Sequence, residues 1–265
     1  MNTLNTPTTV VDIKARLHGA DADEFSVLER SLKADTRKGV RDAVEVARRR
    51  LQAESVERAR IALLYEYQDQ LAGARLVVGL DEVGRGPVAG PLTVGAVILP
   101  DAPYLEGLND SKQVPSAKRE ELSFQIKEVA IAWAIEHIEA DQIDAAGMSA
   151  SLRVAFLRVI RTLEDQGVHP EVILLDGNPM HLDDREINVV KGDARCACIA
   201  AASIIAKVER DSIMCAYADR YPEYGFDKNK GYASAEHREA IARHGLTALH
   251  RRSFCTAFTQ ERLFD

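Results

Sequence analysis

The amino-acid sequence predicts an α/β protein in which helices flank a mixed sheet, preceded by an all-helical N-terminal extension. Residues 1–72 carry apolar side chains at helical spacing. Short apolar runs, typical of buried strands, begin at residue 76. Farther along the chain such runs alternate with helical patterns, which favours a sheet covered by helices. We therefore expect a helical extension over residues 1–72 and an α/β domain, with a helical C-terminal part, over residues 73–265.

The extension is expected to contain three helices. Thr9 is suited to cap a short first helix, and Thr36 to cap a longer second helix whose apolar residues recur every three or four positions. A third helix is expected over about residues 55–72. Arginines at positions 48–50, 58 and 60 make this part locally basic. That charge fits a solvated helix face or, alternatively, a surface that contacts a nucleic-acid backbone and helps to bind substrate.

The domain after residue 72 is expected to hold five strands and several helices. Pro115 can open a helix before the third strand, and the stretch 221–232, rich in Gly, Lys and Tyr, is typical of a loop. The expected strands cover residues 76–80, 93–99, 129–138, 172–175 and 187–190, and further helices are expected over residues 149–166, 195–217 and 235–244.

Composition excludes several classes of protein. The chain has 265 residues, of which 46% are hydrophobic and 28% charged, as in ordinary globular domains. Its uncharged apolar stretches are shorter than the roughly 18 residues that a membrane-spanning helix needs. Acidic residues and the lack of an apolar block in the first 25 positions argue against a secretory signal, and four cysteines are too few for a disulfide framework. We expect a cytoplasmic, monomeric protein that does not enter membranes.

The net charge of −7, from 34 basic and 41 acidic residues, is not that of a basic nucleic-acid binder. An acidic domain can still bind polyanions when its carboxylates gather around divalent cations. Net charge alone therefore does not show whether the substrate is a nucleic acid, and the motifs have to be considered.

Acidic residues follow three of the predicted strands. The run 76–80 leads into Asp81 and Glu82, the run 172–175 into Asp176, and the run 187–190 into Asp193. One Asp beside Gly is ordinary turn chemistry, but strand ends of one sheet can bring all these side chains to one crevice. Carboxylates gathered at one point repel each other unless cations neutralise them, and oxygen ligands suit Mg²⁺ or Mn²⁺. Two such ions, about 3.5–4 Å apart, are a common device for cleaving phosphodiesters.

The geometry of Asp81 and Glu82 depends on where the first strand ends. Side chains alternate between the two faces of a strand, so these neighbours point the same way only if the strand has already ended. Gly84 and Gly86 would permit such a turn.

Beyond these acids, long stretches of the sequence resemble one known family. Seven segments are similar, in the expected order, to motifs of bacterial ribonuclease HII: GLDEVGRGPVAGP (79–91), LNDSK (108–112), KGDA (191–194), IAAASIIAKV (199–208), YGF (224–226), KGY (230–232) and HRRSF (250–254). The resemblance implies a ribonuclease H-like fold and an endonuclease that uses divalent metal ions to cut the RNA strand of RNA–DNA hybrids. It also implies cleavage on the 5′ side of single ribonucleotides embedded in duplex DNA, giving 3′-hydroxyl and 5′-phosphate ends.

The resemblance also implies roles for individual residues. Asp81, Glu82, Asp176 and Asp193 would be the catalytic, metal-binding acids. We expect Asp81 to bridge two Mn²⁺ or Mg²⁺ ions, with Glu82 contributing on one side only. These are the same four residues that the strand-end pattern indicates.

Substrate contacts are implied for a second set of residues. Backbone groups of Gly84, Arg85 and Gly86 would contact the 2′-hydroxyl, the group that distinguishes RNA from DNA locally. Tyr232 would stack on the deoxyribose that follows the ribonucleotide, unless it is a buried aromatic at a helix start. A phosphate-contacting loop would use Asn109, Ser111 and Lys112, while Lys207, Lys228, Lys230 and Arg251 would neutralise the backbone or carry only solvated charge.

Three further features of the sequence have no role among these contacts. Cys196 and Cys198 stand where Ser and Pro are more usual in the family, and we expect them to be small buried residues at a helix start rather than a soft-metal or redox site. The histidines are scattered along the sequence and form no metal-binding motif.

The tail Gln260–Phe264 resembles the Gln-x-x-Leu-Phe ligands of the bacterial sliding clamp, although Leu263 and Phe264 would also suit packing on the domain.

Two rival functions stay open from the sequence. One is another nuclease with this fold, such as a junction resolvase. The other is a protein that binds hybrids without cleaving them.

Overall fold

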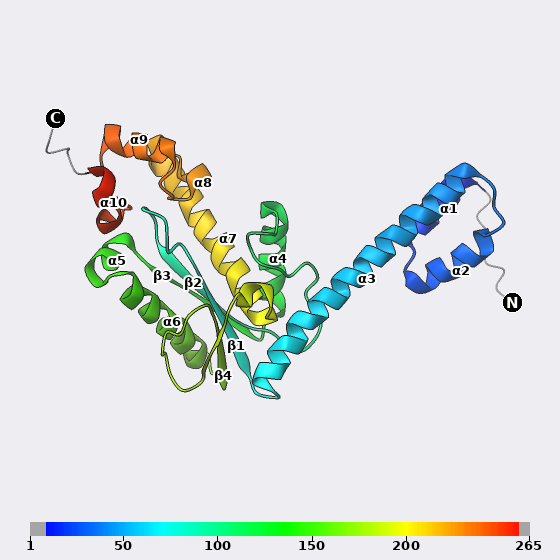
Figure 1. Ribbon diagram of the computed structural model, residues 1–265, viewed down its shortest axis with the longest axis horizontal. Helices are drawn as coiled ribbons and strands as arrows, with labels where there is room; N and C mark the ends of the chain where they lie inside the picture. Colours follow the sequence, from blue (N-terminus) through cyan, green and yellow to red (C-terminus); the bar gives the residue numbers. More distant parts are fainter. Residues whose placement is uncertain (1–8, 260–265) are drawn as a thin grey trace. The chain divides into compact units, whose positions relative to one another are not determined.

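The computed structural model describes residues 9–259 (Figure 1). The chain divides into two compact units, with the boundary between Arg60 and Ile61. The segment Gln260–Phe264, which resembles a clamp ligand, lies outside the described residues. Over residues 9–259, no helix combines the length and the apolar character needed to cross a membrane.

The first unit packs its helices around a small apolar core. Thr9 caps the first helix as predicted, because its side chain accepts a hydrogen bond from the backbone N–H of Asp12. A second helix, which the sequence analysis had not predicted, is capped in the same way by Asp21. The core consists of Ile13, Leu17, Ala20, Phe25, Leu28, Val40 and Ala47. The helices of this unit are α1 (Val10–Gly19), α2 (Ala22–Leu32) and the first part of α3 (Lys38–Ala72).

The two helices predicted on either side of residue 53 are one continuous helix, α3. The residues between them, 51–55, contain neither Gly nor Pro, so nothing in the sequence interrupts the helix there. The helix also begins two residues after Thr36. The side chain of Asp35 accepts the N–H of Arg37 at 3.0 Å just before the helix starts.

A five-stranded mixed sheet forms the centre of the second unit, as the sequence predicts. Its strands lie in the order β3-β2-β1-β4-β5. The pairs β1–β2 and β2–β3 are antiparallel, whereas β1–β4 and β4–β5 are parallel. The strands are β1 (Val77–Val83), β2 (Leu92–Ile98), β3 (Ala132–Ile138), β4 (Val172–Asp176) and β5 (Glu186–Val189).

Helices cover both faces of this sheet (Figure 1). On one face α6 buries Phe156, Val159 and Leu163 against the strands. On the other face α7 lies so close that a Cβ at Gly79 would stand 2.2 Å from the Cys198 backbone, which explains the glycine there. The helices around the sheet are α4 (Ser116–Val129), α5 (Ala140–Ala146), α6 (Met148–Asp165) and α7 (Ala197–Arg220).

The segment 221–232 is not the plain loop that its composition predicts. It contains two short helical pieces, and it buries Tyr224 and Phe226 in an apolar cluster with Met214 and Ile241. A turn composition does not exclude short helices when their aromatic residues can reach a core. The elements of this C-terminal part are η2 (Pro222–Tyr224), α8 (Phe226–Asn229), α9 (Ala235–His244) and α10 (Arg252–Thr259).

Cys196 and Cys198 are free, fully buried thiols at the start of α7, which confirms the prediction. Their sulfur atoms lie 3.5 Å apart. The side-chain oxygen of Gln68 accepts the backbone N–H of Cys198 at 3.0 Å. The cysteine pair therefore belongs to the packing between α3 and α7.

Candidate active site

Three parallel strands carry the predicted acids to one edge of the sheet. Leu80 of β1 is paired with Leu175 of β4, so the next residues, Asp81 and Asp176, lie side by side. Beyond β5 the short helical turn η1 (Gly192–Ala194) contains the third aspartate, Asp193. The strand ends thus bring together acids that are up to 112 positions apart in the sequence.

A tight turn fixes the position of η1 beside β4. Lys191 adopts a left-handed conformation with φ 55°, and the N–H of Gly192 donates to Oδ1 of Asp176 at 2.6 Å. A Cβ at Gly192 would lie 2.6 Å from Ile199, so only glycine fits this close approach. The hydrogen bond orients the Asp176 carboxylate toward the turn that bears Asp193.

Burial and mutual repulsion act on the carboxylates of this cluster. Asp81 is only 6% exposed, and burial raises its pKa well above the usual value, with further contributions from Glu82 and Asp176. Burial also raises the pKa of Glu82, against the opposing effect of the Arg85 guanidinium 3.1 Å away. The pKa of Asp193 is raised by burial, then by Asp176 and Asp110. These four acids therefore form one electrostatically coupled group.

The first strand does not end before Glu82. In its pairing with β2 it continues to Val83, with Asp81 opposite Gly95 and Glu82 opposite Val94. The two acids consequently project toward opposite faces of β1, Asp81 on the face covered by α7. Only the pairing with β4 stops at Leu80, which leaves Asp81 at the edge shared with Asp176.

The donor set suits a divalent cation in its chemistry. All four side chains are carboxylates, the ligands that Mg²⁺ and Mn²⁺ prefer, and a positive charge would offset the repulsion that raises the pKa of Asp81, Glu82 and Asp193. Within residues 9–259, no three His, Cys, Asp or Glu side chains surround a common point closely enough to hold a metal. Ion binding would therefore have to draw the side chains together.

Two buried arginines hold the loop that follows β1. Arg251 and Arg210 are both 0% exposed, yet each donates to backbone carbonyls rather than to carboxylates. Burial lowers the pKa of Arg251 to about 10, which leaves it charged at neutral pH. The prediction that Arg251 neutralises substrate phosphate is wrong, because its guanidinium is enclosed by Gly84, Arg85, Pro87 and Gly90 carbonyls.

The loop requires glycine at Gly84 for conformational and steric reasons. Gly84 has φ +90°, and a Cβ there would lie 2.3 Å from Nε of Arg210. Gly86 is different, because it is exposed and a Cβ would meet only Tyr232 Cε1 at 3.6 Å. The exposed backbone at Gly86 is therefore accessible to a ligand.

Tyr232 is 52% exposed beside Gly86, which contradicts the alternative of a buried aromatic. Its backbone follows Gly231, whose carbonyl accepts the N–H groups of Val88 and Ala89 at 2.9 and 3.2 Å. These hydrogen bonds join the segment that carries Tyr232 to the loop after β1. The structure thus brings Gly84, Gly86, Tyr232 and the acids into one region.

The loop 109–112 contacts helix α7 through Ser111. Asn109 is half-buried, and its side chain accepts the Asp110 N–H at 2.9 Å, while Lys112 is exposed. Ser111 is buried, and its hydroxyl accepts a 2.9 Å hydrogen bond from Ser203 of α7. The hydroxyl of Ser203 also faces Asp81 and lowers the pKa of that acid, against the larger effect of burial, which raises it.

The electrostatic effect of Lys112 and Asp110 on the pKa of Asp193 places this loop near η1. Asp110 and Ser203 both lie inside the motifs, but no pattern in the sequence singles them out. Only contacts across the fold distinguish them from their neighbours.

The remaining predicted cations are only partly available to a ligand. Lys207 is half-buried and forms a 2.7 Å ion pair with Asp211. Lys230 donates to Cys215 Sγ at 2.9 Å and to the Asp227 carbonyl at 2.6 Å. Lys228 is exposed on α8.

Comparison with known proteins identifies the family. The ribonuclease HII family model matches residues 78–257, and that of the ribonuclease HII N-terminal domain matches residues 9–72. The chain is 41% identical over 258 residues to ribonuclease HII of Bacillus subtilis (strain 168), which covers 96% of this chain and 97% of that protein.

Solved structures agree with this assignment. Ribonuclease H2 from Pyrococcus horikoshii OT3 is 26% identical with a TM-score of 0.58, covering 70% of this chain and 99% of that one. The PCNA:RNase HII complex from Archaeoglobus fulgidus gives 27% identity and a TM-score of 0.57, covering 66% and 93%. Bst-RNase HIII in complex with Mn²⁺, at 21% identity and a TM-score of 0.58 over 74% and 73%, shares the fold. The chain belongs to the ribonuclease HII family and is an endoribonuclease with a ribonuclease H-like fold.

Proposed function

We propose that the protein hydrolyses the RNA strand of RNA–DNA hybrids and cuts duplex DNA on the 5′ side of a single embedded ribonucleotide, leaving 3′-hydroxyl and 5′-phosphate ends. The observation that carries this proposal is the coupled group of acids on β1, β4 and η1, together with the exposed Gly86 in the loop that follows β1. The site thus combines a place for cations with a surface for reading one ribose.

Asp81, Glu82, Asp176 and Asp193 would hold two Mg²⁺ or Mn²⁺ ions. Such a pair, when bound, supplies the positive charge that activates a water molecule and stabilises the leaving oxygen. The chain prepares this site through two backbone donors: the Glu82 N–H donates to Asp81 at 2.7 Å and the Gly192 N–H donates to Asp176 at 2.6 Å. These hydrogen bonds orient both carboxylates before substrate arrives.

Recognition of the ribonucleotide is assigned to the loop after β1. The exposed backbone at Arg85 and Gly86 would contact the 2′-hydroxyl, because no side chain at Gly86 blocks the approach. Tyr232, exposed beside Gly86, would stack on the next deoxyribose. Asn109, Ser111, Lys112 and Lys207 would position the flanking phosphates, Ser111 through its contact with α7.

The deciding experiment compares a duplex that contains one ribonucleotide with the same duplex made entirely of DNA, in Mg²⁺ or Mn²⁺. We expect cleavage of the first substrate only, 5′ to the ribonucleotide, and its loss in Asp81→Asn with binding retained. Cleavage of a branched junction that lacks ribonucleotides would instead indicate a resolvase. Failure of the wild type to cleave any hybrid, despite binding it, would indicate a binding protein.

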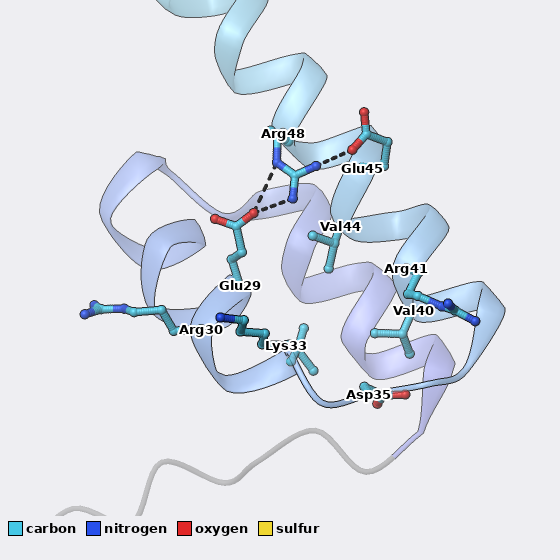
Figure 2. Close-up of a pocket in the computed structure, with 10 residues that line it drawn as sticks. Glu29, Arg30, Lys33, Asp35, Val40, Arg41, Val44, Glu45 and Arg48 are labelled. Atoms are coloured by element: carbon cyan, nitrogen blue, oxygen red, sulfur yellow. Dashed lines mark hydrogen bonds and ion pairs between the residues drawn. The ribbon is translucent and has the colours of Figure 1, made fainter.

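We also propose that residues 1–72 form a separate extension that helps to bind the duplex. Most of the arginines that make this extension locally basic already form ion pairs with its own glutamates. Arg48 lies between Glu29 and Glu45 (Figure 2), Arg49 pairs with Glu45, and Arg50 pairs with Glu54.

The cations better placed to bind phosphate line a cavity of about 590 Å³ between α2 and α3. Arg30, Lys33 and Arg41 border this cavity, and Figure 2 shows Arg41 beside Val40 and Arg30 pointing away from both valines. Replacing all three with Ala should weaken hybrid binding and reduce its salt dependence, because fewer counterions are released. An Arg49→Ala control should change neither quantity, and an unchanged salt slope in the triple variant would contradict this role.

A sliding clamp is the partner proposed for the segment Gln260–Phe264. The Gln-x-x-Leu-Phe pattern supports it, as does the similarity to an RNase HII that was solved in complex with PCNA. Deleting residues 260–265 should abolish clamp association in a pull-down without changing cleavage of short duplexes. Unchanged association would contradict the proposal. A monomer in the cytoplasm is the expected state, to be tested by light scattering and cell fractionation.

A further inference from the structure

The structure brings together two histidines that are scattered in the sequence. His237 of α9 and His250 are 0% and 2% exposed, and their Nε2 atoms lie 3.1 Å apart. Tyr224 and Phe226 flank the pair, with ring centroids 5.1 Å from His250 and 5.3 Å from His237 respectively. Two imidazoles are thus enclosed by aromatic side chains and linked directly by a hydrogen bond.

The partners of the outer nitrogens determine where each proton lies. The backbone N–H of Thr247 donates to Nδ1 of His250 at 3.0 Å, so this nitrogen must be unprotonated. Nε2 of His250 then carries the proton and donates to Nε2 of His237. At the far side, Nδ1 of His237 lies 2.8 Å from the backbone carbonyl of Tyr232. A carbonyl can only accept, so His237 carries its proton on Nδ1.

The hydrogen bonds from Thr247 through His250 and His237 to Tyr232 therefore form a relay, in which each bond has one direction. Both rings are neutral in this arrangement, since a second proton on either would place two donors face to face. Burial lowers the pKa of His237 and that of His250, in agreement with neutral rings. The relay needs histidine at both positions, because each ring accepts on one side and donates on the other.

The end of the relay is the residue proposed to read the substrate. The carbonyl of Tyr232 also accepts the Ser234 N–H at 2.8 Å. The N–H of Tyr232 donates to the Asn229 carbonyl at 2.9 Å. His237 supplies the third constraint, through its hydrogen bond to the Tyr232 carbonyl. The start of the relay adjoins the loop after β1, because His250 forms an isolated β-bridge with Ala89.

We propose that His237 and His250 are positioning residues that set the orientation of Tyr232 against Gly86 and thereby the preference for a ribonucleotide followed by DNA. The inference depends on the proposed reading role of Tyr232. Neither histidine touches the reacting phosphate in this assignment. They act through one backbone carbonyl, so their loss should affect discrimination between substrates more than the chemical step.

The first test is independent of activity. Long-range ¹⁵N–¹H correlation spectra of the imidazoles, recorded on the full chain at neutral pH, report which nitrogen carries the proton. We expect the Nδ1–H tautomer for His237 and the Nε2–H tautomer for His250. The opposite tautomer at either ring, or an imidazolium signal, would overturn the relay.

The second test uses two amide variants that each keep half of the hydrogen bonds of His237. In His237→Asn the amide nitrogen takes the place of Nδ1 and still donates to the Tyr232 carbonyl. In His237→Gln the amide reaches the place of Nε2, accepts from His250, and leaves the Tyr232 carbonyl without this donor. Both variants bury an amide at one site, so a general loss of stability affects them alike.

The measured quantity is the ratio of kcat/KM on a duplex with one ribonucleotide to that on a uniform RNA–DNA hybrid. We expect a roughly threefold to tenfold loss of this ratio in His237→Gln, with a smaller change in His237→Asn, since one hydrogen bond to Tyr232 separates them. Equal ratios in the two variants would overturn the proposal. A Tyr232→Ala enzyme with the wild-type ratio would refute the reading role of Tyr232 itself, whereas the tautomer assignment would still stand.

Discussion

Arg251 ties the two ends of the loop after β1 together, because its Nη2 donates to the carbonyl oxygens of Gly84 at 2.7 Å and Gly90 at 2.8 Å. Its remaining nitrogens donate to carbonyls of the same loop. This loop, which the structure describes in full, has no repeating backbone hydrogen bonds like those of a helix or strand. The buried guanidinium of Arg251 satisfies its carbonyls instead, in the segment that carries the proposed recognition surface. The stability of the loop and the position of Gly86 should depend on this one side chain.

Replacing Arg251 with Lys should therefore disrupt both folding and cleavage. Lysine keeps the charge but presents a single ammonium group instead of a planar fork, and several buried carbonyls would lose their donors. We expect a loss of about 3–5 kcal/mol in the free energy of unfolding, measured by denaturant titration. The neighbouring Arg252 is exposed, so Arg252→Lys should have no measurable effect. Equal stability of the two variants would show that the guanidinium fork is dispensable.

Two glycines of the loop should respond differently to Ala. Gly84→Ala adds a Cβ 2.3 Å from Arg210 in a left-handed backbone region, so we expect a clear loss of stability, about 2 kcal/mol or more. Gly86→Ala meets only ordinary contact with Tyr232 and should fold normally, but it should reduce cleavage at a ribonucleotide by obstructing the backbone. Thermal melts and cleavage rates measured together separate these effects. Full activity of Gly86→Ala would argue against recognition of the 2′-hydroxyl there.

Asp81→Asn should make the protein more stable while it abolishes cleavage. Because the pKa of Asp81 is raised in the folded state, the native protein binds this proton more tightly than the unfolded chain does. Stability is therefore lost as the pH rises above the ordinary pKa of an aspartate and through the raised pKa of Asp81. Removing the charge should add at least about 1 kcal/mol to the free energy of unfolding. Each added kcal/mol should raise Tm by about 2–4 °C. Asp219→Asn, on the exposed side of α7, is the control and should leave Tm unchanged.

Divalent cations should stabilise the wild-type protein through the same acids. An ion that binds only the folded state adds about 2.7 kcal/mol to the free energy of unfolding at 100 times its Kd. We expect Mn²⁺ or Mg²⁺ to raise Tm in differential scanning fluorimetry, and Asp81→Asn to reduce that shift strongly. Sodium chloride at matched ionic strength serves as the control. A shift of equal size in Asp81→Asn would place the bound ion elsewhere.

The buried histidine pair should make the protein sensitive to mild acid. Burial and the neighbouring His237 lower the pKa of His250 to about 4, whereas an unfolded histidine titrates near 6.5. The unfolded chain therefore binds the extra proton first, so this contribution is complete above about pH 6.5 and is lost as pH falls toward 4. We expect wild type to lose about 2–3 kcal/mol more than His250→Gln over this range, measured by urea titration at each pH. Parallel curves for the two proteins would contradict the low pKa.

Local sequence patterns were sufficient for the central elements of this fold. All five predicted strands are present; Asp176 ends β4, Asp193 follows β5, and Asp81 follows the last residue of β1 that pairs with β4. An apolar run followed by an acid is a local signal, because burial of a strand and exposure of its end concern consecutive residues. Local patterns failed in the stretch 221–232, which combines turn-forming residues with aromatic ones. Its aromatic residues reach a core that the local sequence does not reveal.

Patterns in the sequence are enough to specify the helical extension, the order of the five strands along the chain, and which carboxylates can meet at one edge of the sheet. Contacts between distant segments establish that Arg251 is enclosed by carbonyls, that His237 donates toward Tyr232, and that β1 continues past Asp81. The reason is that a charged or titratable side chain is compatible with a surface or with a buried site, depending on the partners it finds. Those partners come from segments as much as 167 residues away, as for Arg251 and Gly84, and no periodicity in the sequence records them.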